Sequence, residues 1–473
     1  MASWIRTALW ICAVIVPCAL GGCNSSQSRA AAAYSEYQTA AAANDLPSAR
    51  RALLKLVAVQ DDNSQTWLEL GRIQAALGSY GDAYYAFGRA RELDRSNPEL
   101  LRTLTQFALS AGNLPEAQKS ASDLEVVAPG DPWVAISRGF SALAEHRYDD
   151  AISASDQVLQ SSPSDSVAKS LKARALLGED RRDDAVALLT SQIQAQPSDV
   201  LSLQLLAKIY ELSGRWADVE RVSRALLRLK PNDTATGLAA TEASFRAGDV
   251  NAGRAISLRL LRRADPQVTE SVLELWRELW TSDERVADAY RLGRTSGTQT
   301  LRLLYAAFLV DVGNPDGALA LAGQANLPIS APNVDANAVI GAALTEKGFL
   351  ASGKQRLDAV LAYDGSNPTA LRARAKLYLV TSPAAAILDA QGLVSALPDS
   401  AEARLLLARA YAASGEPDRA QQTLWAAFHD IPANYLIYNA LSGSLHGNSQ
   451  RLQSLKDEFE VQRGLQLERG LLT

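Results

Sequence analysis

The apolar residues of the chain recur with the spacing of helices, and turn signals interrupt them at regular intervals. Stretches with apolar positions about 3.6 residues apart end at turns that contain Gly112, Gly214 or Gly248. A second apolar stretch follows each turn and ends at a proline, and these prolines stand 34 residues apart, at Pro129, Pro163, Pro197 and Pro231. The pattern predicts a repeated unit of helix, turn, helix, turn.

The repeat has a fixed frame, whose first positions fall at Ala30, Ser64, Pro98, Pro132, Ser166, Val200 and Thr234. Position 20 is then alanine in each of the first five units, at Ala49, Ala83, Ala117, Ala151 and Ala185. A small side chain there lets the second helix approach the first closely, and the proline at position 32 cannot continue a helix. Helices of about 13 residues cannot bury their apolar faces alone, so the units are expected to stack.

Two units show the signature of the repeat most completely. The second unit carries Trp67, Leu70, Gly71, Ala83, Phe87 and Ala90. The unit that begins at Ala401 carries Leu407, Ala408, Tyr411, Gly415, Ala420, Leu424, Ala427 and Pro432. These residues resemble the tetratricopeptide repeat. The resemblance implies an all-α fold, an α-solenoid superhelix of about twelve helix-turn-helix units with a C-terminal capping helix, whose concave surface binds other molecules.

The frame is regular at both ends of the repeat region and irregular in the middle. We predict an N-terminal array over residues 34–267, irregular units over 268–333, a C-terminal array over 334–434 and a capping helical segment over 435–473. Trp276 and Trp280, four residues apart in the irregular part, are expected to pack in the core. This part is either a set of degenerate repeats that still stack, or a hinge or partner site.

The amino terminus has the layout of an export signal. Arg6 precedes an apolar run from Ala8 to Leu20, which is too short to span a membrane as a helix. The stretch Leu20-Gly21-Gly22-Cys23 resembles the lipobox of bacterial lipoproteins, in which the cysteine is acylated and becomes the first residue after cleavage. The resemblance implies a signal peptide over residues 1–22, lipidation of Cys23 and a tether over residues 23–33. An uncleaved anchor is the alternative.

Further features of this region predict the compartment. The residue after the cysteine is Asn24, and the resemblance implies that the absence of aspartate at this place favours the outer membrane, with the protein facing the periplasm. All three cysteines, Cys12, Cys18 and Cys23, lie in the first 23 residues, which excludes a disulfide framework in the rest of the chain.

Charge and chemistry exclude several function classes. The chain has 47 Lys plus Arg against 52 Asp plus Glu, so its net charge of −5 gives no bulk attraction toward nucleic acid. The only histidines are His146, His429 and His446, and no pair has the spacing of a zinc-binding helix. No nucleophile or phosphate-loop motif is present. We therefore predict a protein that is not an enzyme and that needs neither a metal nor a cofactor.

Positions 5 and 9 of each unit are the candidate binding positions, because the resemblance implies that they face the groove. The basic residues there are Arg72, Arg102, Arg174, Lys208, Arg302, Arg372, Lys376 and Arg409, and Glu242 is the only acid. A basic groove attracts anionic segments. Alternatively, Arg and Lys are present because they form helices well and their stems cover apolar surface. The family's clamp for a peptide carboxylate, Lys at 5 with Asn at 9, is absent.

Three hypotheses for function follow, and the sequence leaves them open. The first is a lipid-anchored periplasmic scaffold that binds envelope proteins or acidic peptides, as the resemblance to lipoproteins of exopolysaccharide export and exosortase (PEP-CTERM) systems implies. The second is a pilotin or assembly chaperone for a pilus, a secretin or an outer-membrane protein. The third is direct binding of an anionic glycan in the basic groove. The sequence indicates no oligomeric state.

Overall fold

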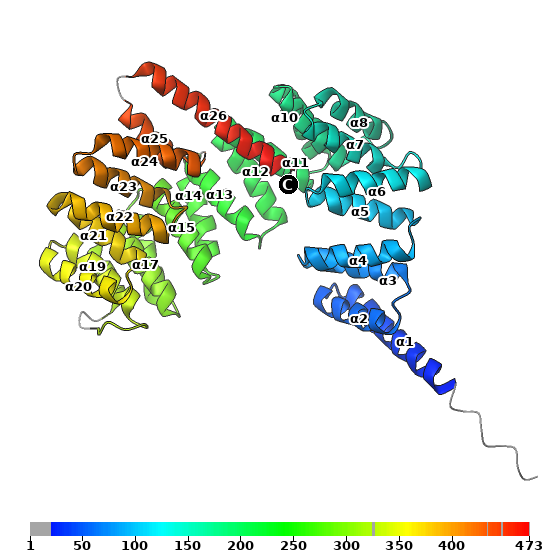
Figure 1. The fold of residues 1–473 in the computed structure, drawn as a ribbon, viewed down its shortest axis with the longest axis horizontal. Coiled ribbons are helices and arrows are strands. Elements are labelled where there is room, and N and C mark those ends of the chain that lie inside the picture. Colours follow the sequence, from blue (N-terminus) through cyan, green and yellow to red (C-terminus); the bar gives the residue numbers. More distant parts are fainter. Residues whose placement is uncertain (1–19, 324–326, 433, 446–447, 473) are drawn as a thin grey trace, which may run out of the picture. The chain divides into compact units, whose positions relative to one another are not determined.

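The computed structural model describes residues 20–323, 327–432, 434–445 and 448–472, and 26 α-helices and no β-strand occur among them. The chain divides into two compact units, one ending at Asp180 and one running from Arg181 to Leu472 (Figure 1). The predicted all-α solenoid fold is therefore confirmed.

The first unit contains nine helices: α1 (Leu20–Ala42), α2 (Leu46–Val59), α3 (Ser64–Ala76), α4 (Tyr80–Leu93), α5 (Pro98–Ser110), α6 (Leu114–Val127), α7 (Pro132–Ala144), α8 (Tyr148–Ser161) and α9 (Ser166–Gly178). The second unit begins with α10 (Arg182–Ala195), α11 (Val200–Leu212), α12 (Trp216–Leu229), α13 (Thr234–Arg246), α14 (Val250–Leu261), α15 (Pro266–Leu279), α16 (Glu284–Thr295), α17 (Gln299–Asp311) and α18 (Pro315–Ala322). It continues with α19 (Val334–Glu346), α20 (Leu350–Tyr363), α21 (Pro368–Thr381), α22 (Pro383–Ala396), α23 (Ala401–Ala413), α24 (Pro417–Asp430), α25 (Tyr435–Ser444) and α26 (Ser449–Leu472).

The predicted frame coincides with the helix starts. Helices α3, α5, α7, α9, α11 and α13 begin at the predicted first positions of their units, and α19, α21 and α23 do so after the irregular part. The helices from α1 to α24 form twelve consecutive pairs, which agrees with the predicted number of units. All of these starts except that of α19 are set by a side chain that accepts a hydrogen bond from a free backbone N–H; Asp165, for example, accepts from Ala168 N at 2.8 Å.

The two helices of a pair pack closely because the residues between them are small. The five alanines at position 20 are fully buried, with 0% of their surface exposed. Gly71 shows how tight the contact is, because a Cβ atom there would lie 2.5 Å from Cε1 of Phe87. A larger residue at these positions would push the second helix away from the first and open the core between pairs.

The turn between the two helices needs a left-handed residue at position 15 of the unit. Four of the units of the N-terminal array have a glycine with a positive φ angle at this position: Gly78, Gly112, Gly214 and Gly248. His146 and Asp180 take the same place with φ of 58° each, so the turn is kept at some cost in backbone energy. His146 therefore lies in a turn, whereas His429 lies in the last turn of α24, the second helix of its pair. His446 lies outside the described residues.

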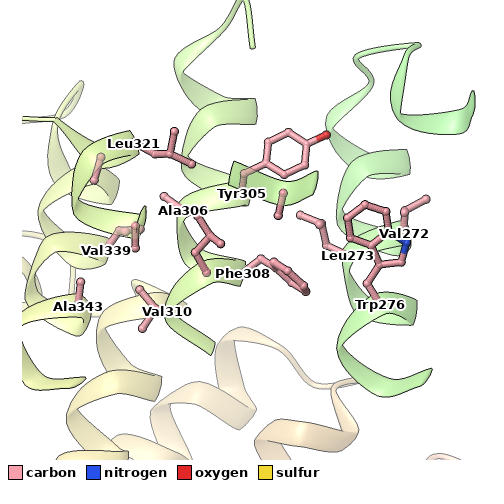
Figure 2. Packing of buried hydrophobic residues seen from close by; sticks show 14 of the residues in the cluster. Val272, Leu273, Trp276, Tyr305, Ala306, Phe308, Val310, Leu321, Val339 and Ala343 are labelled. Atoms are coloured by element: carbon pink, nitrogen blue, oxygen red, sulfur yellow. The ribbon is translucent and has the colours of Figure 1, made fainter. Parts of the chain in front are cut away.

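The irregular part, residues 268–333, still stacks on its neighbours. Trp276 is 0% exposed and Trp280 is 1% exposed, as expected for core residues, and Trp276 packs with Phe308 in one cluster (Figure 2). The irregularity comes from helix ends: the guanidinium of Arg285 donates hydrogen bonds to the carbonyl oxygens of Trp276, at 3.0 Å, and Trp280, and so caps α15. Helix α18 is only eight residues long and is followed by non-helical chain.

One expectation near the amino terminus needs correction. Residues 23–33, expected as a tether, belong to helix α1, and Ala33 is only 4% exposed because it packs into the core of the first hairpins. The predicted capping segment 435–473 contains two helices, α25 and the terminal helix α26. Residues 1–19, most of the expected signal peptide, lie outside the described residues. Within the described part of the chain, no helix combines the length and apolarity that crossing a membrane requires.

We expect Trp276→Ala to lower the free energy of unfolding of the second unit by about 3–5 kcal/mol, because it removes a fully buried indole and leaves a cavity. Urea denaturation with hydrogen exchange of α15 and α17 measures this. Val380→Ala is the control, since Val380 is 88% exposed and its truncation should change stability by less than about 0.5 kcal/mol. Equal stability of the two variants would contradict the packing described here.

Candidate protein-binding surface

One face of each unit is built from the first helices of successive pairs. In the first unit α5 contacts α7 and α7 contacts α9. In the second unit contacts run from α13 through α15, α17, α19, α21 and α23 to α25. The eight basic candidates lie on first helices, α3, α5 and α9 in the first unit and α11, α17, α21 and α23 in the second. We call each row of first helices the inner face of its unit.

In the first unit, two of the three candidates are held by acids of the same row. Arg72 pairs with Glu69 at 3.0 Å and with Glu99 of the next first helix at 2.9 Å. Arg102 donates from Nε and Nη2 to one carboxylate oxygen of Asp131, at 3.0 and 2.6 Å. Asp131 also accepts from the backbone N–H of Trp133, so it caps α7. These arginines join one repeat to the next.

Arg174 differs from both. It is partly buried on α9, and within the described residues it has no carboxylate partner; its Nε is buried without a hydrogen bond. Its guanidinium carbon lies 5.9 Å from the centre of the Phe140 ring. Burial lowers the pKa of Arg174 to about 10, because leaving water disfavours the charged form. Arg174 is therefore a charge that the fold accommodates without neutralising it.

In the second unit, Arg372 and Lys376 share two acids. Lys376 Nζ lies 3.4 Å from Oδ1 of Asp311 and 3.9 Å from Glu402. Arg372 lies 3.8 Å from Oδ2 of Asp311 and 3.5 Å from Glu402. Arg277 of α15 adds a third cation at 3.0 Å from Asp311, whose side chain is only 10% exposed. Asp311 thus ties α15, α17 and α21 together.

The space beside this cluster is too small for a ligand. The cavity lined by Asp311, Thr345, Arg372 and Lys376 measures about 20 Å³, which is room for about one water molecule. Nε of Arg372 is buried without a hydrogen-bond partner among the described residues. The cluster is a closed ion network that joins four first helices, and it offers its charge to a partner only where Lys376 and Glu402 reach solvent.

The remaining candidates are more accessible. Lys208 pairs with Glu211 on its own helix at 3.2 Å, and the pair is about half exposed. Arg302 and Arg409 are exposed and have no ion pair within the described residues. Arg409 stands at a cleft between α23, α24 and α25 whose other lining includes Leu405, Ala412 and Leu424. Arg302 and Arg409 are the basic side chains of the second unit most available to a partner.

The inner faces are less basic than the residues at positions 5 and 9 alone indicate. Glu69, Glu99, Asp131, Glu211, Asp311 and Glu402 stand elsewhere in the units and pair with five of the eight basic residues. The charge balance predicted from the sequence did not include these acids, because it was taken over positions 5 and 9 only and the acids stand at other positions of the units. Glu242, the predicted lone acid, pairs with Arg246 at 2.8 Å. That the eight residues bind a partner stays a prediction.

No group of three or more His, Cys, Asp or Glu side chains in the described residues could hold a metal ion. His146 accepts or donates one hydrogen bond with the Tyr148 hydroxyl at 2.8 Å, and His429 lies 3.5 Å from Glu458. The described surface therefore shows ion pairs, aromatic contacts and a shallow cleft, which are means of binding another macromolecule.

Comparisons with known proteins identify the repeat. A family model of the tetratricopeptide repeat matches residues 142–209 and 382–441. These two segments are similar to tetratricopeptide repeats. The matches cover α8 to α11 and α22 to α25, together with the turns between these helices.

One curated protein shares sequence with part of the chain. Over 122 residues, 25% of this chain, the sequence is 34% identical to the cytochrome c-type biogenesis protein CycH of Pseudomonas aeruginosa. The match covers 30% of CycH, so the chain spans less than a third of the length of this relative.

Solved structures of other helical proteins resemble the chain at low scores. They include MamA, with 18% identity and a TM-score of 0.31 over 36% of this chain and 92% of that one. PilW, a type IV pilus biogenesis factor, shows 16% identity and a TM-score of 0.34 over 42% of this chain and 92% of its own. Yeast Tom70 shows 12% identity and a TM-score of 0.32 over 93% and 97%.

We expect Arg174→Met to raise the free energy of unfolding of the first unit by about 1 kcal/mol, because the thioether fills similar space without a desolvated charge. Urea denaturation at neutral pH measures the change. Lys172→Met is the matched control on the same helix, since Lys172 has a carboxylate partner, Asp156, at 2.6 Å and its loss should not stabilise. Loss of stability at Arg174 equal to that at Lys172 would show that Arg174 is satisfied in the fold.

Proposed function

We propose that this protein is a lipid-anchored scaffold of the bacterial cell envelope, which holds other envelope proteins on the inner faces of its two helical units. It faces the periplasm from the outer membrane, it performs no catalysis, and its partners belong to an assembly process, with exopolysaccharide export as the first candidate. The observation that carries the proposal is the pair of rows of first helices, which present long polar faces.

The chemistry of the inner faces supports protein binding. The ion pairs Arg102–Asp131 and Arg372–Glu402 join neighbouring first helices and hold them in register. A partner segment that lies along a row therefore meets a rigid surface and loses little free energy in ordering it. Arg302 and Arg409 supply positive charge that steers acidic segments to the second unit.

Two observations support an assembly role in the envelope. The relative CycH is named for the biogenesis of c-type cytochromes, which is an assembly process, and it shares 34% identity over 122 residues. The stretch from Leu20 to Cys23 has the pattern of a lipid-attachment site. Acyl chains contribute about 0.8 kcal/mol for each buried CH₂ group, so more than one chain gives a stable anchor.

The relative's name also favours the alternative in which the protein is an assembly chaperone that delivers a component of a pilus, a secretin or an outer-membrane protein. A scaffold keeps its partners, whereas a chaperone releases them after assembly. The identity and lifetime of the captured partners decide between these two functions. An anionic glycan bound by the basic residues is a third outcome of the same experiment.

The anchor is tested by replacing Cys23. Cys23→Ala is expected to abolish incorporation of an alkyne-labelled fatty acid and to release the protein from the membrane fraction, because the thiol is the atom that is acylated. Cys18→Ala is the control, since that residue lies within the predicted signal peptide and leaves with it. Labelling that persists in Cys23→Ala, or is lost equally in Cys18→Ala, would overturn the lipid anchor.

The binding surface is tested by photocrosslinking in the envelope. A photoreactive residue at position 302 or 409 is expected to capture envelope proteins, and one at position 388, on the second helix α22 where Leu388 is 69% exposed, is expected to capture few. Capture at 302 should fall about tenfold in the Arg409→Glu variant, as for loss of about 1.4 kcal/mol of charge attraction, but not in Arg259→Glu on α14. Equal capture from position 388 would contradict the assignment of the surface.

The identity of the captured proteins then separates the functions. Exopolysaccharide export proteins that stay bound support the scaffold, and pilus, secretin or outer-membrane proteins captured only during assembly support the chaperone. Retention on an anionic glycan column that Arg174→Glu, Lys208→Glu and Arg372→Glu weaken would support glycan binding.

A further inference from the structure

The last helix of the chain returns to the start of the second unit. Helix α26 contacts α25, which precedes it, and also α11, which lies more than 230 residues earlier. Figure 1 shows α26 running from the end of α25 back toward α11 and α12. The eight helix pairs from α11–α12 to α25–α26 therefore close on themselves inside the second unit. A simple stack of repeats has contacts only between neighbours, so this closure needs its own explanation.

Arg246, at the end of α13, makes the best-defined contact of the closure. Its guanidinium carbon lies 5.2 Å from the centre of the Tyr435 ring, at the start of α25, and 5.0 Å from the centre of the Trp216 ring, at the start of α12. Glu242 and Glu278 accept from Arg246 at 2.8 and 3.3 Å. The side chain of Arg246 is only 18% exposed. The guanidinium is thus held between two rings and two carboxylates.

Tyr435 also contacts α26. Its ring lies 5.1 Å from the ring of Phe459 at an angle of 74°, an edge-to-face geometry that is favourable for aromatic pairs. Phe459 is 2% exposed and Leu455 is 0% exposed, and both pack in the cluster that includes Phe428 of α24. The pair α25–α26 is therefore one packed body, and Arg246 is the residue of α13 that holds it.

We propose that α25–α26 is a latch, which docks in cis on α11–α13 through Arg246 and closes the second unit, so that a partner reaches the inner face only after the latch opens. The claim that a partner is excluded rests on the proposed function, whereas the docking itself does not.

The contacts are of the right strength for a reversible latch. A cation over one aromatic ring changes an equilibrium constant by about two- to thirtyfold. Arg246 contacts one ring of the latch, so loss of this contact is expected to shift the open population by about tenfold and to leave the rest of the unit folded. The cluster around Phe459 stays intact in the open state, because it is formed by α23, α24, α25 and α26 and includes no residue of α11, α12 or α13.

Hydrogen exchange of the full-length protein in detergent tests the docking. In Arg246→Ala and Tyr435→Ala, the amides of α26 are expected to exchange about tenfold faster, with α19 to α21 unchanged. Tyr435→Phe keeps the ring and should exchange like the parent protein. Arg259→Ala on α14 removes an exposed arginine and is the matched control for Arg246→Ala. Unchanged exchange of α26 in both alanine variants overturns the latch.

Photocrosslinking from position 409 tests the gating in the same variants. Opening the latch is expected to raise partner capture several-fold in Arg246→Ala and Tyr435→Ala, but not in Tyr435→Phe. Faster exchange without increased capture overturns the gating. If no variant and no parent protein captures an envelope protein, the proposed function fails, and the exchange rates still decide whether α25–α26 docks. If Arg246→Ala does not fold, the comparison of Tyr435→Ala with Tyr435→Phe decides.

Discussion

The structure depends on one constraint, which is that each helix pair can bury its apolar face only against the next pair. Two helices of 13 or 14 residues have too little surface to form a core of their own, so the apolar side chains of one pair must fit between those of its neighbours. The fully buried alanines at position 20 agree with this constraint, because a small residue lets the second helix approach the first closely. The inner face follows from the same stacking, since first helices that stack side by side form a continuous row.

The fold could be predicted from the sequence because this constraint is local and repeated. A cap such as Asn97, the helix start at Pro98 and the turn at Gly112 are each set by neighbours within a few residues, and the frame multiplies the signal. The irregular segment was harder for the same reason. The end of α15 is set by Arg285, which donates hydrogen bonds to the carbonyl oxygens of Trp276 and Trp280. This contact occurs once and not in every repeat, so the sequence pattern does not predict it.

The charges of the candidate site could be predicted only in part. The sequence identified Arg372 and Lys376, but their partner Asp311 lies 65 residues before Lys376 and stands at the end of a first helix. Only the stacking of α17, α19 and α21 brings these residues together. Arg174 differs from Arg372 and Lys376. The sequence identified it as a candidate groove residue, but only the structure shows that no carboxylate among the described residues pairs with it. A partly buried charge without a partner lowers stability, and such sites are where function and stability compete.

Arg246 connects the row of first helices to the closure of the second unit. Arg246 takes part in the row of first helices through Glu278 of α15 and in the closure through Tyr435 of α25. Burial raises the pKa of Glu278, so this carboxylate is charged at a cost that its contact with Arg246 offsets only in part. Any ligand that moves α13 against α15 therefore changes the environment of Arg246, and with it the contact to Tyr435. Because coupling between two binding events is reciprocal, a partner that binds the inner face only when α25–α26 is undocked weakens the docking to the same degree as the docking weakens its binding.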